Sequence, residues 1–263
     1  DTVFTFTCQF TPQASAAPIL TFAEVQQASS GHWQNYWTQG AVADFSQCTD
    51  VRAKELERRV VLSQYLLAIQ CAGSTPPQET GLTYNSWFGK IHLEMIWWHQ
   101  AQFALWGHPD LPDRTFSWYE TVDPIAGKIS QRQGFKGIRW MKMTDPSGTE
   151  APSKVGSFLI WQQPHLIYLA ELLYRANPSE ELLKKYNSLI QDTADFMYSF
   201  ATYVEEHDRY VLKGAIPAQE TLRAAETVNP PFELSYWHFA MQVAQTWRER
   251  TGMERVPECD VLI

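Results

Sequence analysis

Hydrophobic and polar positions alternate with a helical period over most of the chain. Residues 51–73 carry their charges early and their apolar side chains late, and the segment ends at Gly73. This pattern predicts a helix with a buried second half. Thr21 and Glu24 have capping-box spacing, which predicts a short helix, and residues 30–38 predict a second, aromatic-rich helical turn. The same periodicity predicts further helices within residues 84–107, 113–131, 158–178, 181–204 and 232–252.

The N-terminal segment has a different pattern. Thr and Phe alternate over residues 2–10, which is typical of a β-strand, and a Pro/Ala-rich linker follows. A single strand needs a partner for its backbone groups, so this strand is expected to join a sheet that is either small here or lost from the N-terminus. We therefore predict a strand and linker over residues 1–20 and a helical domain over residues 21–263.

The spacing of the connections defines the architecture. Long connections at residues 74–91, 132–153 and 206–231 recur after every second one of the six substantial helices predicted. Antiparallel helix hairpins stacked in this way would place all three connections on one face. This pattern predicts an all-α toroid or solenoid rather than a four-helix bundle, with a functional site at that face. Aromatic residues and methionines within 134–153 favour an ordered connection.

Composition excludes several classes of protein. The chain has 263 residues, of which 44% are hydrophobic, and a net charge of −8, which argues against a nucleic-acid partner. No apolar run reaches the roughly 18–20 residues of a membrane span. Four scattered cysteines form no CxxC pair, so zinc-finger and thioredoxin interpretations fail. Disulfides and buried free thiols both remain open, and an extracytoplasmic location is slightly favoured.

The stretch from Tyr84 to Gly107 carries the most unusual chemistry. It combines tryptophans with two histidines and a carboxylate, among them His92, Glu94 and Trp97. Sugar rings offer C–H faces that stack on aromatic rings and hydroxyls that hydrogen-bond to such polar groups. A metal site on a helical face shared by His92 and His99 is disfavoured because neither an HExxH motif nor a set of carboxylates accompanies them. No metal and no cofactor is expected.

Four segments carry a resemblance to a known family. They are GKIHLEMIWWH (89–99), GFKGIRWMKM (134–143), IWQQPHLIYLAELLYR (160–175) and AIPAQETLRAAETVNPPFEL (215–234). Their order resembles that of the six-hairpin, (α/α)6-barrel glycosidases, in particular glycoside hydrolase family 65 and its clan. The resemblance implies a barrel of twelve main helices, of which this chain supplies about half. His92 stands where the family has a substrate-binding aspartate, and Gln219 stands where it has an acidic residue.

The resemblance also implies roles for individual residues. Glycoside hydrolysis needs a protonated carboxyl group and a second carboxylate about 5–10 Å away. The resemblance places the general acid on Glu220, in a proline-flanked, charge-poor loop that would shield it from water. Glu233 is a second carboxylate that could approach Glu220 or cap the final helix. The residues expected to bind substrate are His92, Glu94, Trp97, Arg139, Trp140, Lys142, Gln163 and His165.

The predicted function is that of a glycoside hydrolase acting on an α-linked glucoside or related oligosaccharide by general acid/base catalysis. Three alternatives stay open: a non-catalytic carbohydrate-binding helical module, an inactive fragment of a larger glycosidase, and a helical-toroid lyase using Tyr84 and His92. An incomplete barrel would expose the apolar seams of its terminal hairpins. A second copy of the chain or the missing C-terminal half of the barrel would cover those seams.

Overall fold

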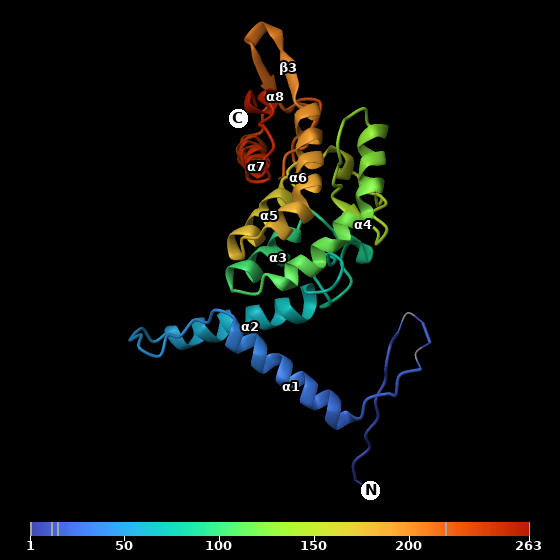
Figure 1. The fold of residues 1–263 in the computed structure, drawn as a ribbon, viewed down its shortest axis with the longest axis vertical. Coiled ribbons are helices and arrows are strands. Elements are labelled where there is room, and N and C mark those ends of the chain that lie inside the picture. The colour runs from blue at the N-terminus through green and yellow to red at the C-terminus, as the bar shows by residue number, and fades with distance from the viewer. Residues whose placement is uncertain (1, 12, 15, 219, 263) are drawn as a thin grey trace.

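The structure is a computed structural model that describes residues 2–11, 13–14, 16–218 and 220–262 (Figure 1). The helices in this part of the chain are α1 (Phe22–Gln39), α2 (Ala53–Cys71), α3 (Ile96–Leu105), α4 (Asp110–Arg132), α5 (His165–Ala176), α6 (Glu180–Phe200), α7 (Pro231–Arg250) and α8 (Pro257–Asp260). Two small antiparallel sheets pair β1 (Ile91–His92) with β2 (Met143–Thr144) and β3 (Thr202–Val204) with β4 (Arg209–Val211). The predicted all-α fold class is confirmed.

Local sequence signals set several helix starts. The capping box of Thr21 and Glu24 is formed at the start of α1, and the Ser179 side chain accepts a hydrogen bond from the N–H of Leu182 at the start of α6. Pro164 immediately precedes α5, so it marks the beginning of that helix rather than a kink. The prediction of a short helix and a separate turn before residue 39 is wrong, because α1 continues through both.

The predicted N-terminal strand is also wrong. Residues 2–10 form neither a helix nor a strand, and the segment extends away from the helical body (Figure 1). Phe4 and Phe10 are almost fully exposed. The physical reason is that no other strand lies beside this segment within the described residues, so its alternating pattern has no sheet to join.

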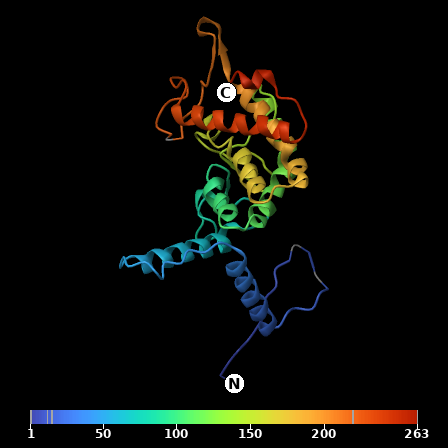
Figure 2. The ribbon, with the colours of Figure 1, turned by 60° about the vertical axis from the view of Figure 1, so that its left-hand side comes forward.

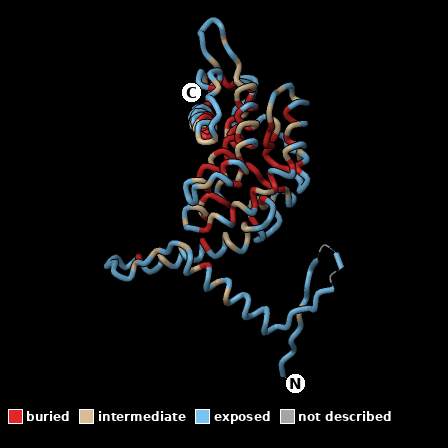
Figure 3. The backbone as a smooth tube through the Cα atoms, viewed as in Figure 1, coloured by how far each residue is buried: buried red, intermediate tan, exposed pale blue. Residues whose placement is uncertain are grey.

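The main core lies between α3, α4, α5, α6 and α7, where the buried residues gather (Figure 3). Figure 2 shows α7 lying across the end of the body formed by α5 and α6. Two ion-pair networks connect helices across this core. Lys185 on α6 binds Asp113 on α4 at 2.9 Å, and the buried Glu171 on α5 binds Arg250 on α7 at 2.5 Å.

The helices α1 and α2 form an arm that projects from this body (Figure 1). The second half of α2 was expected to be buried, but Leu62, Leu66 and Ile69 are exposed, so that prediction is wrong. Leu67 and Ala68 are partly buried, but the outward-facing apolar residues of α2 have no covering helix in the described part of the chain. The arm is attached through a separate small hydrophobic cluster that contains Tyr36 and Phe103.

The long connections follow α2, α4 and α6, as the spacing predicts, and they meet. Antiparallel pairing of β1 with β2 joins the first connection to the second, and a parallel bridge between Leu159 and Ile216 joins the second to the third. The 134–153 connection is ordered, and residues 138–144 within it are buried. All four cysteines are free, and among the described helices none is both long and apolar enough to cross a membrane.

Candidate functional site

The Tyr84–Gly107 stretch is only partly helical. After a turn at Gly89 the chain forms β1, makes a tight turn over residues 93–95 and enters α3 at Ile96. His92 therefore lies on a strand, and His99 lies on a helix. The two side chains therefore do not share a helical face.

The three long connections bring three charged side chains together. Lys142 Nζ lies 3.0 Å from Glu94 Oε2 and also contacts a carboxylate oxygen of Glu220. Glu94 and Lys142 are buried, whereas the Glu220 side chain is 33% exposed. A hydrogen bond of 3.3 Å from the Glu94 N–H to the Lys142 carbonyl fixes the two backbones beside each other. We call Glu94, Lys142 and Glu220 the charged cluster.

Burial and charge shift the protonation equilibria of the charged cluster. Burial raises the pKa of Glu94, although the hydrogen bond from Lys142 opposes that rise. Burial also disfavours the ammonium of Lys142, but hydrogen bonds to Glu220 and Glu94 outweigh it and raise the pKa of Lys142. Two carboxylates thus share one cation, and Glu94 is the buried one.

His92 adds a neutral imidazole to the edge of the charged cluster. Its side chain is 2% exposed, and its Nε2 lies 3.6 Å from Glu94 Oε2. Burial, the charge of Lys142 and His99 together lower the pKa of His92 to about 3. Neither ring nitrogen has a hydrogen-bond partner among the described residues. A buried polar group without a partner costs about 1–3 kcal/mol, so this position favours a bound hydroxyl.

A second histidine positions the turn that carries Glu94. His165 Nε2 lies 2.9 Å from the Glu94 carbonyl, which can only accept, so this nitrogen carries the proton. The other ring nitrogen then accepts from the Tyr236 hydroxyl at 2.8 Å. Burial lowers the pKa of His165 to about 4, consistent with a neutral ring. The Trp161 indole N–H donates to Glu94 Oε1 at 2.9 Å and fixes the carboxylate itself.

An aromatic groove of about 390 Å³ lies beside the charged cluster. Its lining comes from α3, α5, α7 and the segment before α5. The lining residues are Trp97, Trp98, Trp161, His165, Tyr168, Phe232, Ser235, Tyr236 and Phe239. Trp161 and His165 connect the charged cluster to the groove, because each is hydrogen-bonded to Glu94 and also lines the groove. The predicted residue Trp97 is therefore in the groove and not in contact with the carboxylates.

The surroundings of Glu220 differ from the expectation. The loop was expected to shield Glu220 from charge and water, but the side chain is partly exposed and paired with Lys142. Glu233, in the first turn of α7, accepts a hydrogen bond of 2.7 Å from the Ala218 N–H and so holds the turn before Glu220. Gln219 lies outside the described residues.

Three predicted substrate-binding residues lie behind the charged cluster. The buried Arg139 donates to the carbonyl of Ser157 at 2.7 Å and stacks over Phe196. The indole N–H of Trp140 donates to a threonine hydroxyl on α6 at 3.1 Å, and Gln163 bonds the backbone at residues 138 and 140. The structure therefore brings His92, Glu94, Lys142, Glu220 and His165 together, and it places these three in the frame around them.

Sequence reasoning missed Tyr236 and assigned Trp161 no role. Tyr236, Phe232 and Phe239 recur at i, i+4 and i+7 spacing along α7, so they form an aromatic stripe that the sequence contains. Nothing in the local pattern shows that this stripe faces Trp97 and Trp98, because the facing helix lies more than a hundred residues earlier in the chain.

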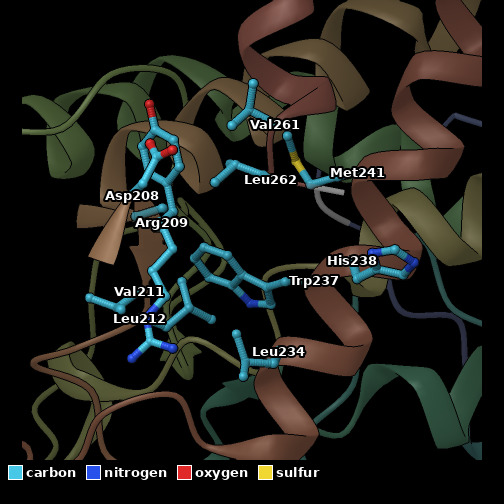
Figure 4. A pocket seen from close by; sticks show the side chains of 12 residues that line it. Asp208, Arg209, Val211, Leu212, Leu234, Trp237, His238, Met241, Val261 and Leu262 are labelled. Atoms are coloured by element: carbon cyan, nitrogen blue, oxygen red, sulfur yellow. The ribbon is translucent and has the colours of Figure 1, made fainter. Parts of the chain in front are cut away.

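Other candidate sites are weaker. The described residues contain no group of three metal-ligating side chains in position to hold an ion. A separate cavity of about 220 Å³ lies between the β3–β4 hairpin, α7 and the C-terminal segment (Figure 4). Trp237 and Met241 line it from another face of α7, and it shares no lining residue with the aromatic groove.

Comparison with known proteins supports the fold. No family model matches the chain, and no curated protein sequence matches it. Among solved structures it is similar to a protein described as "Putative kojibiose phosphorylase from human microbiome", with a TM-score of 0.70 and 10% sequence identity. The match covers 92% of this chain and 35% of that protein. The likeness confirms a helical toroid-type fold, as the sequence resemblance implies, for a chain that spans about a third of its neighbour.

Proposed function

We propose that the chain is the glucoside-binding part of a carbohydrate-active helical toroid. The observation that carries the proposal is the buried His92, whose unpartnered ring nitrogens lie beside Glu94 and Lys142. Sugar hydroxyls both donate and accept hydrogen bonds, so they match a neutral imidazole, a carboxylate and an ammonium set side by side. The name of the structural neighbour, a kojibiose phosphorylase, supports a saccharide as the ligand.

The proposal also assigns a catalytic role to one residue. Glu220 would act as the general acid toward an α-linked glucoside, because it is the more exposed carboxyl group and faces the same ammonium as Glu94. Cleavage also needs a second group that activates the other reactant, water or phosphate.

Binding can be tested by titrating methyl α-D-glucoside into the protein in a calorimeter. Replacing His92 by leucine removes both ring nitrogens, and we expect it to weaken affinity by about tenfold, the equivalent of one buried hydrogen bond. His207→Leu, which changes an exposed histidine in the β3–β4 hairpin, is the matched control and should bind like the wild type. Wild-type protein that binds no glucoside, or equal affinity in His92→Leu at an unchanged Tm, would refute the proposal.

The catalytic part is tested by release of glucose from α-glucobioses, with and without phosphate. Activity that is present in the wild type and lost in Glu220→Gln, with binding retained, would support Glu220 as the acid. Binding without release would favour a non-catalytic carbohydrate-binding module or the need for the rest of the barrel. Release that persists in Glu220→Gln would assign the acid to another carboxyl group, with Glu94 next to be tested.

A further inference from the structure

The aromatic groove and the charged cluster are neighbouring compartments of opposite chemistry. Seven of the nine residues that line the groove are Trp, Tyr or Phe, whereas the cluster consists of two carboxylates and an ammonium. Trp161 lies at the boundary, since its N–H faces Glu94 and its ring is part of the groove wall. A ligand that occupied both would have to be polar at one end and apolar at the other.

The groove has few polar atoms left for a second sugar ring. A sugar bound between aromatic side chains still needs hydrogen-bonding groups around the edge of its ring, because each hydroxyl that leaves water must be satisfied. Here the Trp161 N–H is bonded to Glu94, and the two nitrogens of His165 are bonded to Glu94 and Tyr236. The polar groups left in the lining are the hydroxyls of Ser235 and Tyr168 and two indole N–H groups, those of Trp97 and Trp98. An apolar group makes no such demand, and aromatic edges and faces bind it well.

We infer that the substrate is an amphipathic glycoside, with its sugar ring at the charged cluster and an aryl or alkyl aglycone in the aromatic groove. The inference rests on the proposed function and narrows it from glucosides in general to those with an apolar leaving group. The groove volume of about 390 Å³ is within the range of small-ligand pockets and accommodates a phenyl group. Trp98, which is 50% exposed, and Phe232 leave the groove open to solvent at one side, so longer aglycones can extend out of it.

The experiment compares three ligands by calorimetry: phenyl α-D-glucoside, methyl α-D-glucoside and maltose. We expect the phenyl glucoside to bind about tenfold more tightly than either of the others, the effect of burying roughly one ring of apolar surface. Trp98→Ala should remove most of that preference. Phe10→Ala is the matched control, because it removes an exposed aromatic ring far from the groove and should change none of the three affinities.

Each outcome separates this inference from the proposed function. Equal affinity for maltose and phenyl glucoside, unchanged in Trp98→Ala, would overturn the inference while leaving sugar binding intact. Benzyl alcohol binding as tightly as phenyl glucoside would also overturn it, since the groove would then take apolar ligands with no contribution from the sugar. If none of the ligands binds, the proposed function itself fails. A folded Trp98→Ala protein, shown by an unchanged Tm, is required in every comparison.

Discussion

Replacing Lys142 by methionine tests how the charged cluster is held together. The substitution keeps an apolar stem of similar length and removes the ammonium that contacts Glu94 and Glu220. Lys142 and Glu94 are both buried, and removing one partner of a buried ion pair costs about 3–5 kcal/mol, because the remaining charge is left unpaired. Glu220 contributes little to this cost because water reaches its side chain.

The cost should depend on pH in a defined direction. Burial holds the folded-state pKa of Glu94 above its unfolded value, so protonation of Glu94 favours the folded state. In Lys142→Met the destabilisation is therefore largest at pH 8 and diminishes as the pH falls through the folded-state pKa, where Glu94 becomes neutral. Adding Glu94→Gln should restore most of the lost stability at pH 8.

Urea unfolding followed by tryptophan fluorescence, at pH 8 and pH 5.5, measures these free energies. Lys154→Met, which changes an exposed lysine, is the control and should alter the free energy of unfolding by no more than about 0.5 kcal/mol. A loss below about 1 kcal/mol at pH 8 in Lys142→Met, or a loss equal at both pH values, would refute the reasoning about a buried, mutually dependent cluster.

Two further predictions concern the frame around the site. Glu171→Gln should cost about 3 kcal/mol at pH 7, because it weakens a buried pair with Arg250. Burial acts to raise the pKa of Glu171, but its arginine hydrogen bonds lower it overall. Wild-type stability should therefore fall as the pH drops through the lowered folded-state pKa, and urea unfolding of the variant should lack this contribution. Gly137→Ala should lower the Tm far more than Gly134→Ala. Both glycines have positive φ, but only at Gly137 would the added Cβ atom meet a carbonyl oxygen, that of Asp192, 2.0 Å away. Equal Tm values would contradict that account.

The sequence was most informative where the cause of a structure is local. The Thr21 capping box, the Ser179 cap and the start of α5 after Pro164 all depend on residues within one helical turn. Predictions from the sequence were wrong where the structure of a segment depends on a partner that is distant in the chain. Residues 2–10 have a strand pattern with no sheet to join, and several apolar residues in the second half of α2 stay exposed.

The candidate site also combines features that the sequence predicted with features that it could not predict. The spacing of the long connections predicted that they share a face, and therefore that Lys142 and Glu220 come from neighbouring loops, whereas Glu94 was expected near the start of a helix. The contact between Lys142 and Glu220 joins residues 78 positions apart, which no periodicity can register. Arg139 has a motif position typical of a ligand contact, yet the buried carbonyls of residues 157 and 159 need a donor, and its guanidinium meets that need.

The arm of α1 and α2 has a consequence for how the molecule fluctuates. Its connection to the body is a small cluster around Tyr36 and Phe103, supplemented by hydrogen bonds such as the one from Gln100 to the Cys71 carbonyl at 2.7 Å. A segment with so few buried contacts forms its own cooperative unit, which opens at a lower free energy than the rest. Amide hydrogens of α1 and α2 should therefore exchange with solvent while those of α5, α6 and α7 are still protected, and the charged cluster would persist through openings of the arm.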